Sequence, residues 1–206
     1  MSRRIDYYFT IISPWAYLGH ALFLDIAKRH DVEIVYKPLP LMKVFPESGG
    51  LPLGQRHPLR QSYRLMELQR WREARGVPMH IKPRHWPFDP AMADRLVLAA
   101  QAAGADAGKL AGLCFKAVFE DQRDLTQSET LAAILAEGGF SPDLLAQAQS
   151  EAIGNEYEAL KDSALAAGVF GSPSYVLDGE IFWGQDRLDL LQSALASGRK
   201  AYSADV

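Results

Sequence analysis

The stretch Tyr7-Tyr8-Phe9-Thr10-Ile11-Ile12-Ser13-Pro14-Trp15-Ala16 joins two kinds of secondary structure. Residues 4–12 are rich in aromatic and β-branched side chains, which indicates a buried strand. Apolar residues at helical spacing follow and predict a helix over about 14–30. Ser13 is therefore the predicted helix N-cap, with Pro14 at the first helical position. Unpaired N–H groups and the helix dipole favour an anion, such as a thiolate, at this point.

Residues 13–16 contain no sulfur, so a thiolate held at this helix start has to come from a ligand. A Ser-Pro pair before a helix is also a common cap without any further role. The Ser-Pro motif alone favours a simple helix cap. Motifs in the second half of the chain favour a ligand-binding role instead.

Composition narrows the class of protein. The 206 residues suffice for one domain, or for one domain with a large insertion. The net charge of −3 gives no electrostatic case for a nucleic acid or an anionic membrane as partner. Basic residues cluster loosely between Arg56 and Arg84, which suits a small anionic ligand. Cys114 is the only cysteine, so no intramolecular disulfide forms, and its apolar surroundings predict a buried, inert thiol.

The chain start does not read as a signal peptide, because the apolar run after Arg4 lasts only about eight residues and includes Asp6. No segment approaches the roughly 20 apolar residues of a membrane span. We therefore expect a cytoplasmic protein.

The remaining elements follow in a regular order. A second strand is predicted at 32–36, and Pro- and Gly-rich loops at 38–56 and 77–90 flank a helix at 58–75. The segments predicted as further helices are 91–103, 107–121, 127–137, 141–149 and 151–167. Strands at 174–177 and 180–183 flank Asp178-Gly179, a strong hairpin signal, and a last helix is predicted at 186–198.

This order is βαβ, a helical block, and then ββα. The two flanking parts, residues 1–40 and 169–206, together predict an α/β thioredoxin fold. Residues 41–168 then form a large all-helical insertion, which need not fold by itself.

Gly171-Ser172-Pro173 precedes the first strand of the hairpin. A proline at a strand entry after a glycine turn is compatible with a cis bond, although an ordinary edge-strand proline explains it equally well when taken alone. In a thioredoxin-like fold this proline is cis and faces the Ser13 junction, and the backbone of the residue before it pairs with an extended ligand.

Four stretches carry a family resemblance. They are Asp6-Tyr7-Tyr8-Phe9 with Ser13-Pro14-Trp15-Ala16-Tyr17-Leu18, Leu68-Gln69-Arg70-Trp71, Val169-Phe170-Gly171-Ser172-Pro173-Ser174, and Phe182-Trp183-Gly184-Gln185-Asp186-Arg187-Leu188. With them the chain resembles the 2-hydroxychromene-2-carboxylate isomerases and the related kappa-class glutathione transferases, in the DsbA-like branch of the thioredoxin fold.

The resemblance implies that the protein binds glutathione. It implies that the Ser13 hydroxyl donates to the glutathione sulfur as the catalytic contact, and that Ser172, followed by Pro173, pairs with the cysteinyl unit. The γ-glutamyl end is then held by Trp183, Gly184, Gln185 and Asp186, with Asp186 on the ammonium and helix N–H groups on the carboxylate. The alternative for Asp186 is simple capping of the last helix beside a solvated Arg187.

The second substrate is expected between the fold and the insertion, near 40–57 and 80–90. Here the sequence departs from the isomerases. Pro46 stands where they place a lysine for the substrate carboxylate, and Lys43 is the nearest cation. Arg56 alone is available to replace their Asn-Arg pair, and Trp86 stands in place of a substrate-side tyrosine. A set of aromatic residues either lines a pocket or belongs to the core, with the two interpretations equally favoured: Tyr63, Trp71, Trp86 and Phe88.

Three functions follow from these observations. The first is a glutathione-dependent isomerase that acts on an aromatic or conjugated ketoacid in aromatic catabolism. The second is a transferase or peroxidase of the kappa-class type, and the third is a thioredoxin-like binding protein without turnover. The resemblance also implies a homodimer. None of the five histidines has metal-ligand spacing, so no metal site is predicted.

Overall fold

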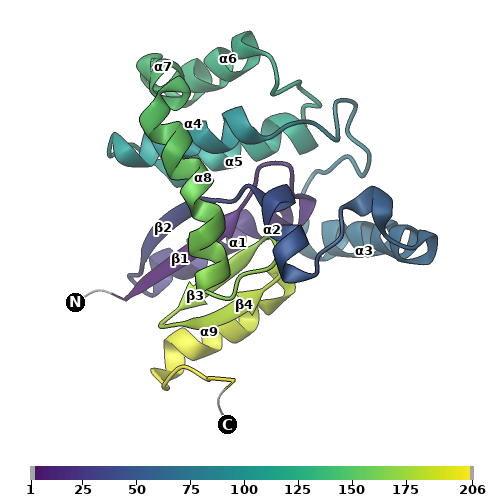
Figure 1. The fold of residues 1–206 in the computed structure, drawn as a ribbon. Helices are drawn as coiled ribbons and strands as arrows, with labels where there is room; N and C mark the ends of the chain where they lie inside the picture. Colours follow the sequence, from purple (N-terminus) through teal and green to yellow (C-terminus); the bar gives the residue numbers. More distant parts are fainter. Residues whose placement is uncertain (1–2, 205–206) are drawn as a thin grey trace.

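A four-stranded mixed sheet lies at the centre of the molecule in the computed structural model, which describes residues 3–204 (Figure 1). Its strands are β1 (Arg4–Phe9), β2 (Glu33–Pro38), β3 (Ser174–Leu177) and β4 (Glu180–Trp183), in the order β2-β1-β3-β4. β1 and β2 are parallel, whereas β1–β3 and β3–β4 are antiparallel. This arrangement confirms the predicted α/β thioredoxin fold.

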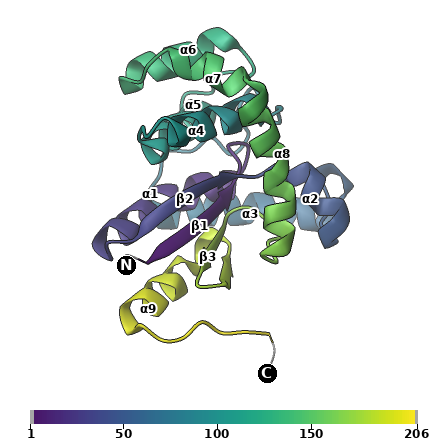
Figure 2. The same cartoon turned by 60° about the vertical axis from the view of Figure 1, so that its left-hand side comes forward.

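Nine helices are present in the described residues, of which the first and the last belong to the thioredoxin part and the other seven to the insertion. They are α1 (Pro14–Arg29), α2 (Leu41–Ser48), α3 (Pro58–Arg75), α4 (Ala91–Ala102), α5 (Ala107–Phe119), α6 (Ser128–Gly138), α7 (Asp143–Gln149), α8 (Glu151–Ala166) and α9 (Leu188–Ser197), with short 3₁₀ turns η1 (Leu53–Gln55) and η2 (Gln185–Arg187). In both views α4–α7 stack beyond the β2 edge of the sheet, and α9 lies toward the opposite end of the strand order, near β4 (Figures 1 and 2). Within residues 3–204 no helix has the length and apolarity to cross a membrane.

The two faces of the sheet bury different clusters because side chains alternate along β1. Tyr7 and Phe9 enter the large core, where the Tyr7 ring lies 4.4 Å from that of Phe9 and 5.2 Å from that of Tyr175. Tyr8 points to the opposite face and packs in a smaller cluster with Val44 of α2 and Ala164 of α8. The sheet is thus covered on both faces.

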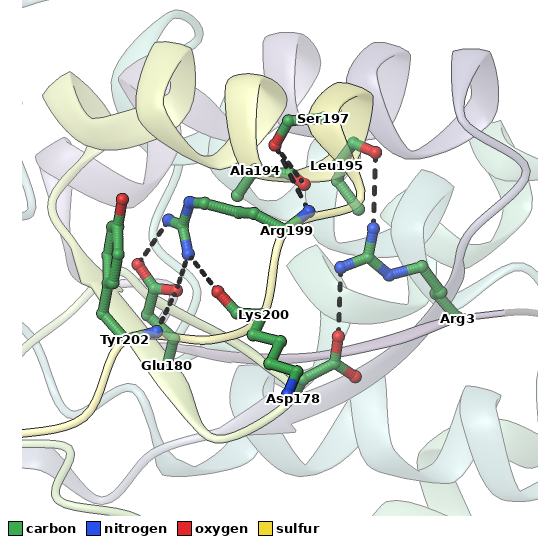
Figure 3. Close-up of polar contacts among 9 residues, drawn as sticks. All are labelled: Arg3, Asp178, Glu180, Ala194, Leu195, Ser197, Arg199, Lys200 and Tyr202. Atoms are coloured by element: carbon green, nitrogen blue, oxygen red, sulfur yellow. Dashed lines mark hydrogen bonds and ion pairs between the residues drawn. The ribbon is translucent and has the colours of Figure 1, made fainter.

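The predicted hairpin is confirmed, since Asp178 (φ 52°) and Gly179 (φ 87°) both have the positive φ of a tight two-residue turn. Beyond α9 the chain returns to β4, the edge strand. Figure 3 shows the Glu180 carboxylate accepting from the Arg199 guanidinium at 2.7 and 2.8 Å and from the Tyr202 N–H at 3.0 Å. The C-terminal segment therefore covers part of the exposed edge.

The predicted loop at 38–56 is wrong in part, because it contains the helix α2 and the turn η1. Pro46 lies inside α2, where it removes a backbone donor. The helix forms because Val44 packs in the cluster with Ala164 of α8, so tertiary packing outweighs the local proline signal.

Two predicted boundaries also need correction. The first strand ends at Phe9 rather than at residue 12, because the Thr10 hydroxyl and the Ile11 N–H both bond to the carboxylate of Asp94, each at 2.8 Å. The last helix begins at Leu188 rather than at 186, since residues 185–187 form a 3₁₀ turn.

Candidate active site

Ser13 lies at the junction of β1 and α1, as the sequence predicts. It is the N-cap of α1: its Oγ accepts from the Ala16 N–H at 3.2 Å, and Pro14 opens the helix. The Oγ–H of Ser13 donates to the backbone carbonyl of Ser172 at 3.4 Å. The residue is 7% exposed, so its hydroxyl group lies in a largely desolvated position at a positive helix terminus.

The Ser172-Pro173 peptide bond is cis, and the loop that contains it faces this junction. The Oγ of Ser172 accepts from the Thr10 N–H at 3.2 Å, which ties the loop to the turn after β1. Behind the loop, the Pro173 carbonyl accepts from the Gly184 N–H at 2.9 Å. These bonds bring the Ser13 hydroxyl, Ser172 and the residues after β4 together.

Glycines shape the segment that follows β4. Gly184 has φ 102°, and a Cβ there would lie 2.3 Å from Oδ1 of Asp186, so no other residue fits without rearrangement. Gly171 is constrained by a close contact alone, because a Cβ would lie 2.3 Å from Nε1 of Trp183. Trp183 is 52% exposed and meets Phe170 edge to face at 4.7 Å. An exposed indole thus stands at the edge of the site.

A cavity of about 530 Å³ opens between this segment and α3 of the insertion. The residues that line it are Trp15, Arg56, Leu59, Arg60, Tyr63, Arg64, Glu67, Trp71, Ser172, Trp183, Gly184, Gln185 and Asp186. Its volume falls in the range of small-molecule sites, and it combines aromatic side chains with a few charged ones.

The charges in this cavity are mainly positive. Burial and the neighbouring Arg56 lower the pKa of Arg64 to about 10. Burial and Arg60 lower the pKa of Arg56. Mutual repulsion of guanidinium groups in a partly desolvated wall favours an anionic ligand, which would relieve it.

Two predicted glutathione residues have partners within the protein. The Asp186 carboxylate pairs with Arg187 at 2.8 Å and makes no side-chain cap, so neither sequence interpretation describes its contacts fully. Gln185 is 2% exposed, and Arg75 of α3 donates to its side-chain oxygen and to its carbonyl, each at 2.8 Å. Arg75 thus fixes the turn η2 from the insertion side.

Of the three residues predicted to contact the second substrate, one lines the cavity and two do not. Arg56 lines the cavity, whereas Lys43 does not: it lies on α2, and its ammonium pairs with Glu158 of α8. Trp86 is absent from the lining, and its Nε1–H donates to the Ile12 carbonyl at 2.9 Å. In the aromatic set, Tyr63 and Trp71 line the cavity, while Trp86 and Phe88 pack against the core.

Arg60 and Arg64 were predicted only as members of the basic cluster between Arg56 and Arg84. Asp94 and Arg75 were not predicted as site residues. The spacing of Arg56, Arg60 and Arg64 at every fourth residue was the available signal for a basic helix face. Asp94 gives no such signal, because its role arises only from long-range contacts.

The cavity lining contains no cysteine. Among residues 3–204 no group of three or more His, Cys, Asp and Glu side chains is placed to hold a metal ion. Cys114 is fully buried in α5, as predicted, and does not line the cavity.

Comparisons with known proteins agree with this description. The profile of the DSBA-like thioredoxin domain matches residues 4–196. A 2-hydroxychromene-2-carboxylate isomerase of Sphingobium xenophagum is 30% identical over 198 residues, which cover 95% of this chain and 99% of the relative. A solved 2-hydroxychromene-2-carboxylate isomerase shares the fold with a TM-score of 0.78 at 24% identity, covering 94% of this chain and 95% of that one. The cytosolic disulfide reductase DsbM of Pseudomonas aeruginosa, solved with GSH, gives a TM-score of 0.70 at 16% identity, covering 95% and 98%.

Proposed function

Since the chain belongs to the DsbA-like thioredoxin family and is related over nearly its full length to 2-hydroxychromene-2-carboxylate isomerases, we propose that it is a glutathione-dependent isomerase of that type. The observation that carries the proposal is the position of the Ser13 hydroxyl. It sits at the N-terminus of α1 and bonds to the carbonyl of Ser172, a cavity residue, at a site without a cysteine. A ligand thiolate is the group that this arrangement would stabilise.

The residues present fit glutathione. The cavity of about 530 Å³ is large enough for a tripeptide together with part of a second ligand. Ser172 offers its backbone to the cysteinyl unit, and Gly184 also lines the cavity. Asp186 supplies a carboxylate for the γ-glutamyl ammonium. The structure of DsbM with GSH, which has the same fold, supports glutathione as the ligand.

When bound, glutathione supplies a thiolate whose reversible addition to a conjugated ketoacid permits rotation about the former double bond. Ser13 contributes by turning its Oγ–H from the Ser172 carbonyl toward the sulfur, which lowers the thiol pKa. Arg56 holds the substrate carboxylate, and Trp15, Tyr63 and Trp71 give the planar acid apolar faces on which to stack. Positioning of both reactants in one cavity lowers the entropic part of the barrier.

The test compares Ser13→Ala with Ser150→Ala. Ser150 caps α8 by accepting from the Ile153 N–H at 3.3 Å, so both substitutions remove one N-cap, at a cost of about 1 kcal/mol each. We expect Ser13→Ala to lower kcat for isomerisation of 2-hydroxychromene-2-carboxylate about 100-fold and to raise the thiol pKa of bound glutathione, read from thiolate absorbance. Ser150→Ala should lose stability only. Equal activity in the two variants contradicts the role of Ser13.

Glutathione binding is measured separately by calorimetry, with Asp186→Asn compared with Asp189→Asn. Asp189 is an exposed carboxylate at the start of α9 outside the cavity lining. Affinity should fall about fivefold to tenfold for Asp186→Asn only, because a partly exposed ion pair is worth about 1 kcal/mol. No binding at millimolar concentration would refute the whole proposal.

A kappa-class-like transferase is the second candidate, and two contacts favour it. Lys43 pairs with Glu158 instead of facing the cavity, and the Trp86 N–H is already bonded to the Ile12 carbonyl. The polar groups that the isomerases use on the ketoacid are therefore fewer. Turnover of an aromatic halide with glutathione, without turnover of the hydroxychromene acid, would favour this function. The expected homodimer and cytoplasmic location belong to the proposal in either case.

A further inference from the structure

One face of α3 presents two arginines to the cavity, and a third precedes the helix. Arg56, Arg60 and Arg64 follow one another at every fourth residue, and all three line the cavity. Like charges at this spacing repel one another and destabilise an isolated helix. Burial first, and then the neighbouring guanidinium group, lowers the pKa of Arg56 and of Arg64. Local helix stability therefore does not account for this arrangement.

The acidic residues of the cavity are already engaged elsewhere. Glu67 pairs with Arg70, and Asp186 pairs with Arg187. In the described part of the chain no carboxylate lies within ion-pair distance of Arg56, Arg60 or Arg64. Arg56 does donate from Nε to the Leu51 carbonyl at 2.8 Å, which orients it without neutralising its charge.

The contacts of Arg64 lead back to the residue that precedes Ser13. Arg64 is half-buried, and its guanidinium carbon lies 5.2 Å from the centre of the Trp86 ring. Trp86 in turn donates to the carbonyl of Ile12, the residue before Ser13. This chain of contacts holds the Arg64 charge on the side of the cavity nearest the start of α1.

We propose that Arg60 and Arg64 form a second carboxylate subsite, so that the preferred second substrate is an aromatic or conjugated dicarboxylate. This inference rests on the proposed function for the placement of glutathione. Arg56 pairs with the ketoacid carboxylate in the proposed function, so Arg60 and Arg64 remain without a carboxylate partner. A second carboxylate on the substrate binds to this pair, and the planar fork of arginine suits bidentate binding of that group.

The experiment uses two probes with one skeleton: cinnamate, a monoanion, and ortho-carboxycinnamate, a dianion. Each is titrated calorimetrically into the protein with and without saturating glutathione. The wild type should bind the dianion at least about tenfold more tightly than the monoanion. Arg64→Gln should reduce this preference to less than about twofold. Arg72→Gln, an exposed arginine of α3 outside the lining, should leave it unchanged.

The outcomes separate this inference from the proposed function. Failure of glutathione to bind, with the dianion preference intact and dependent on Arg64, refutes the proposed function alone. Equal affinities for the two probes, or no binding of either, refute the second subsite. If Arg64→Gln weakens glutathione binding but leaves the dianion preference unchanged, the arginines serve the tripeptide and the inference is wrong.

Discussion

Burial shifts the pKa values of Asp94 and His20 in opposite directions. Their contributions to the pH dependence of folding stability should therefore largely cancel in the wild-type protein. The Asp94 carboxylate accepts from the Thr10 hydroxyl, the Ile11 N–H and the Tyr157 hydroxyl, yet burial raises its pKa from 3.8 to about 7. Burial lowers the pKa of His20 from 6.5 to about 4. The neutral ring donates from Nε2 to the Gly108 carbonyl at 2.9 Å.

The signs follow from proton binding. Between pH 3.8 and 7 the folded state keeps a proton on Asp94 that the unfolded chain has released, so the free energy of unfolding falls as pH rises. About three pKa units at ~1.4 kcal/mol each amount to about 4 kcal/mol. Between pH 4 and 6.5 the unfolded chain holds a proton on His20 that the folded state lacks, so stability rises by about 3 kcal/mol. The two contributions nearly cancel.

Single substitutions should uncover each contribution. In Asp94→Asn an amide oxygen still accepts from the Ile11 N–H and the amide N–H groups face the two hydroxyl groups, but the site no longer titrates. Relative to the wild type, this variant should gain about 4 kcal/mol of stability between pH 4 and pH 7. His20→Gln should lose about 3 kcal/mol over the same interval. Urea unfolding of each variant and of the wild type at several pH values gives both differences in the free energy of unfolding. The other titratable groups contribute equally to variant and wild type, so their contributions cancel.

The reasoning fails if the free-energy difference between Asp94→Asn and the wild type stays constant from pH 4 to pH 7. Asp94 would then be ionised in both the folded and the unfolded state, and its three hydrogen bonds would outweigh the cost of burial. A wild type that loses stability relative to Asp94→Asn only below pH 3.8 would mean that the bonds lower the pKa of Asp94 below its unfolded value.

Two further predictions concern packing and thiol chemistry. Gly19→Ala should cost about 1–3 kcal/mol in urea unfolding, because its Cβ would lie 2.7 Å from the Cβ of Gln185. Gly112→Ala, whose Cβ meets His20 no closer than 3.6 Å, should instead gain about 0.5–1 kcal/mol; equal effects of the two substitutions would contradict this packing. Cys114 should react with a thiol reagent only after unfolding, since burial raises its pKa to about 12, and rapid labelling of the native protein would contradict its burial.

The fold was predictable because its signals are local. The aromatic strand before Ser13 and the Asp178-Gly179 turn both depend on neighbouring residues, and both elements form, although the strand ends at Phe9 rather than at residue 12. The helix α2 was not predictable from its own sequence, because Pro46 and the surrounding glycines indicate a loop. Its stability comes from contacts with α8, more than a hundred residues away in the chain.

The candidate site was predictable in outline and not in its contacts. Residue identity placed Ser13, Ser172 and Asp186 in one region through the resemblance. The pairing of Asp186 with Arg187, and the hold of Arg75 on Gln185, depend on how η2 sits against α3. Such contacts leave no periodic pattern, so only the three-dimensional structure reveals them.

The insertion does more than cover the thioredoxin part. Asp94 bonds to Thr10 and Ile11, and Trp86 bonds to Ile12, so side chains of the insertion fix each residue of the turn that leads to Ser13. Arg75 fixes the opposite wall at Gln185. The thioredoxin part therefore supplies the groups proposed for glutathione, while the insertion both aligns them and adds a cationic wall. Under the proposed function, substitutions on the cavity face of α3 should therefore change substrate preference while the contacts around Ser13 stay in place.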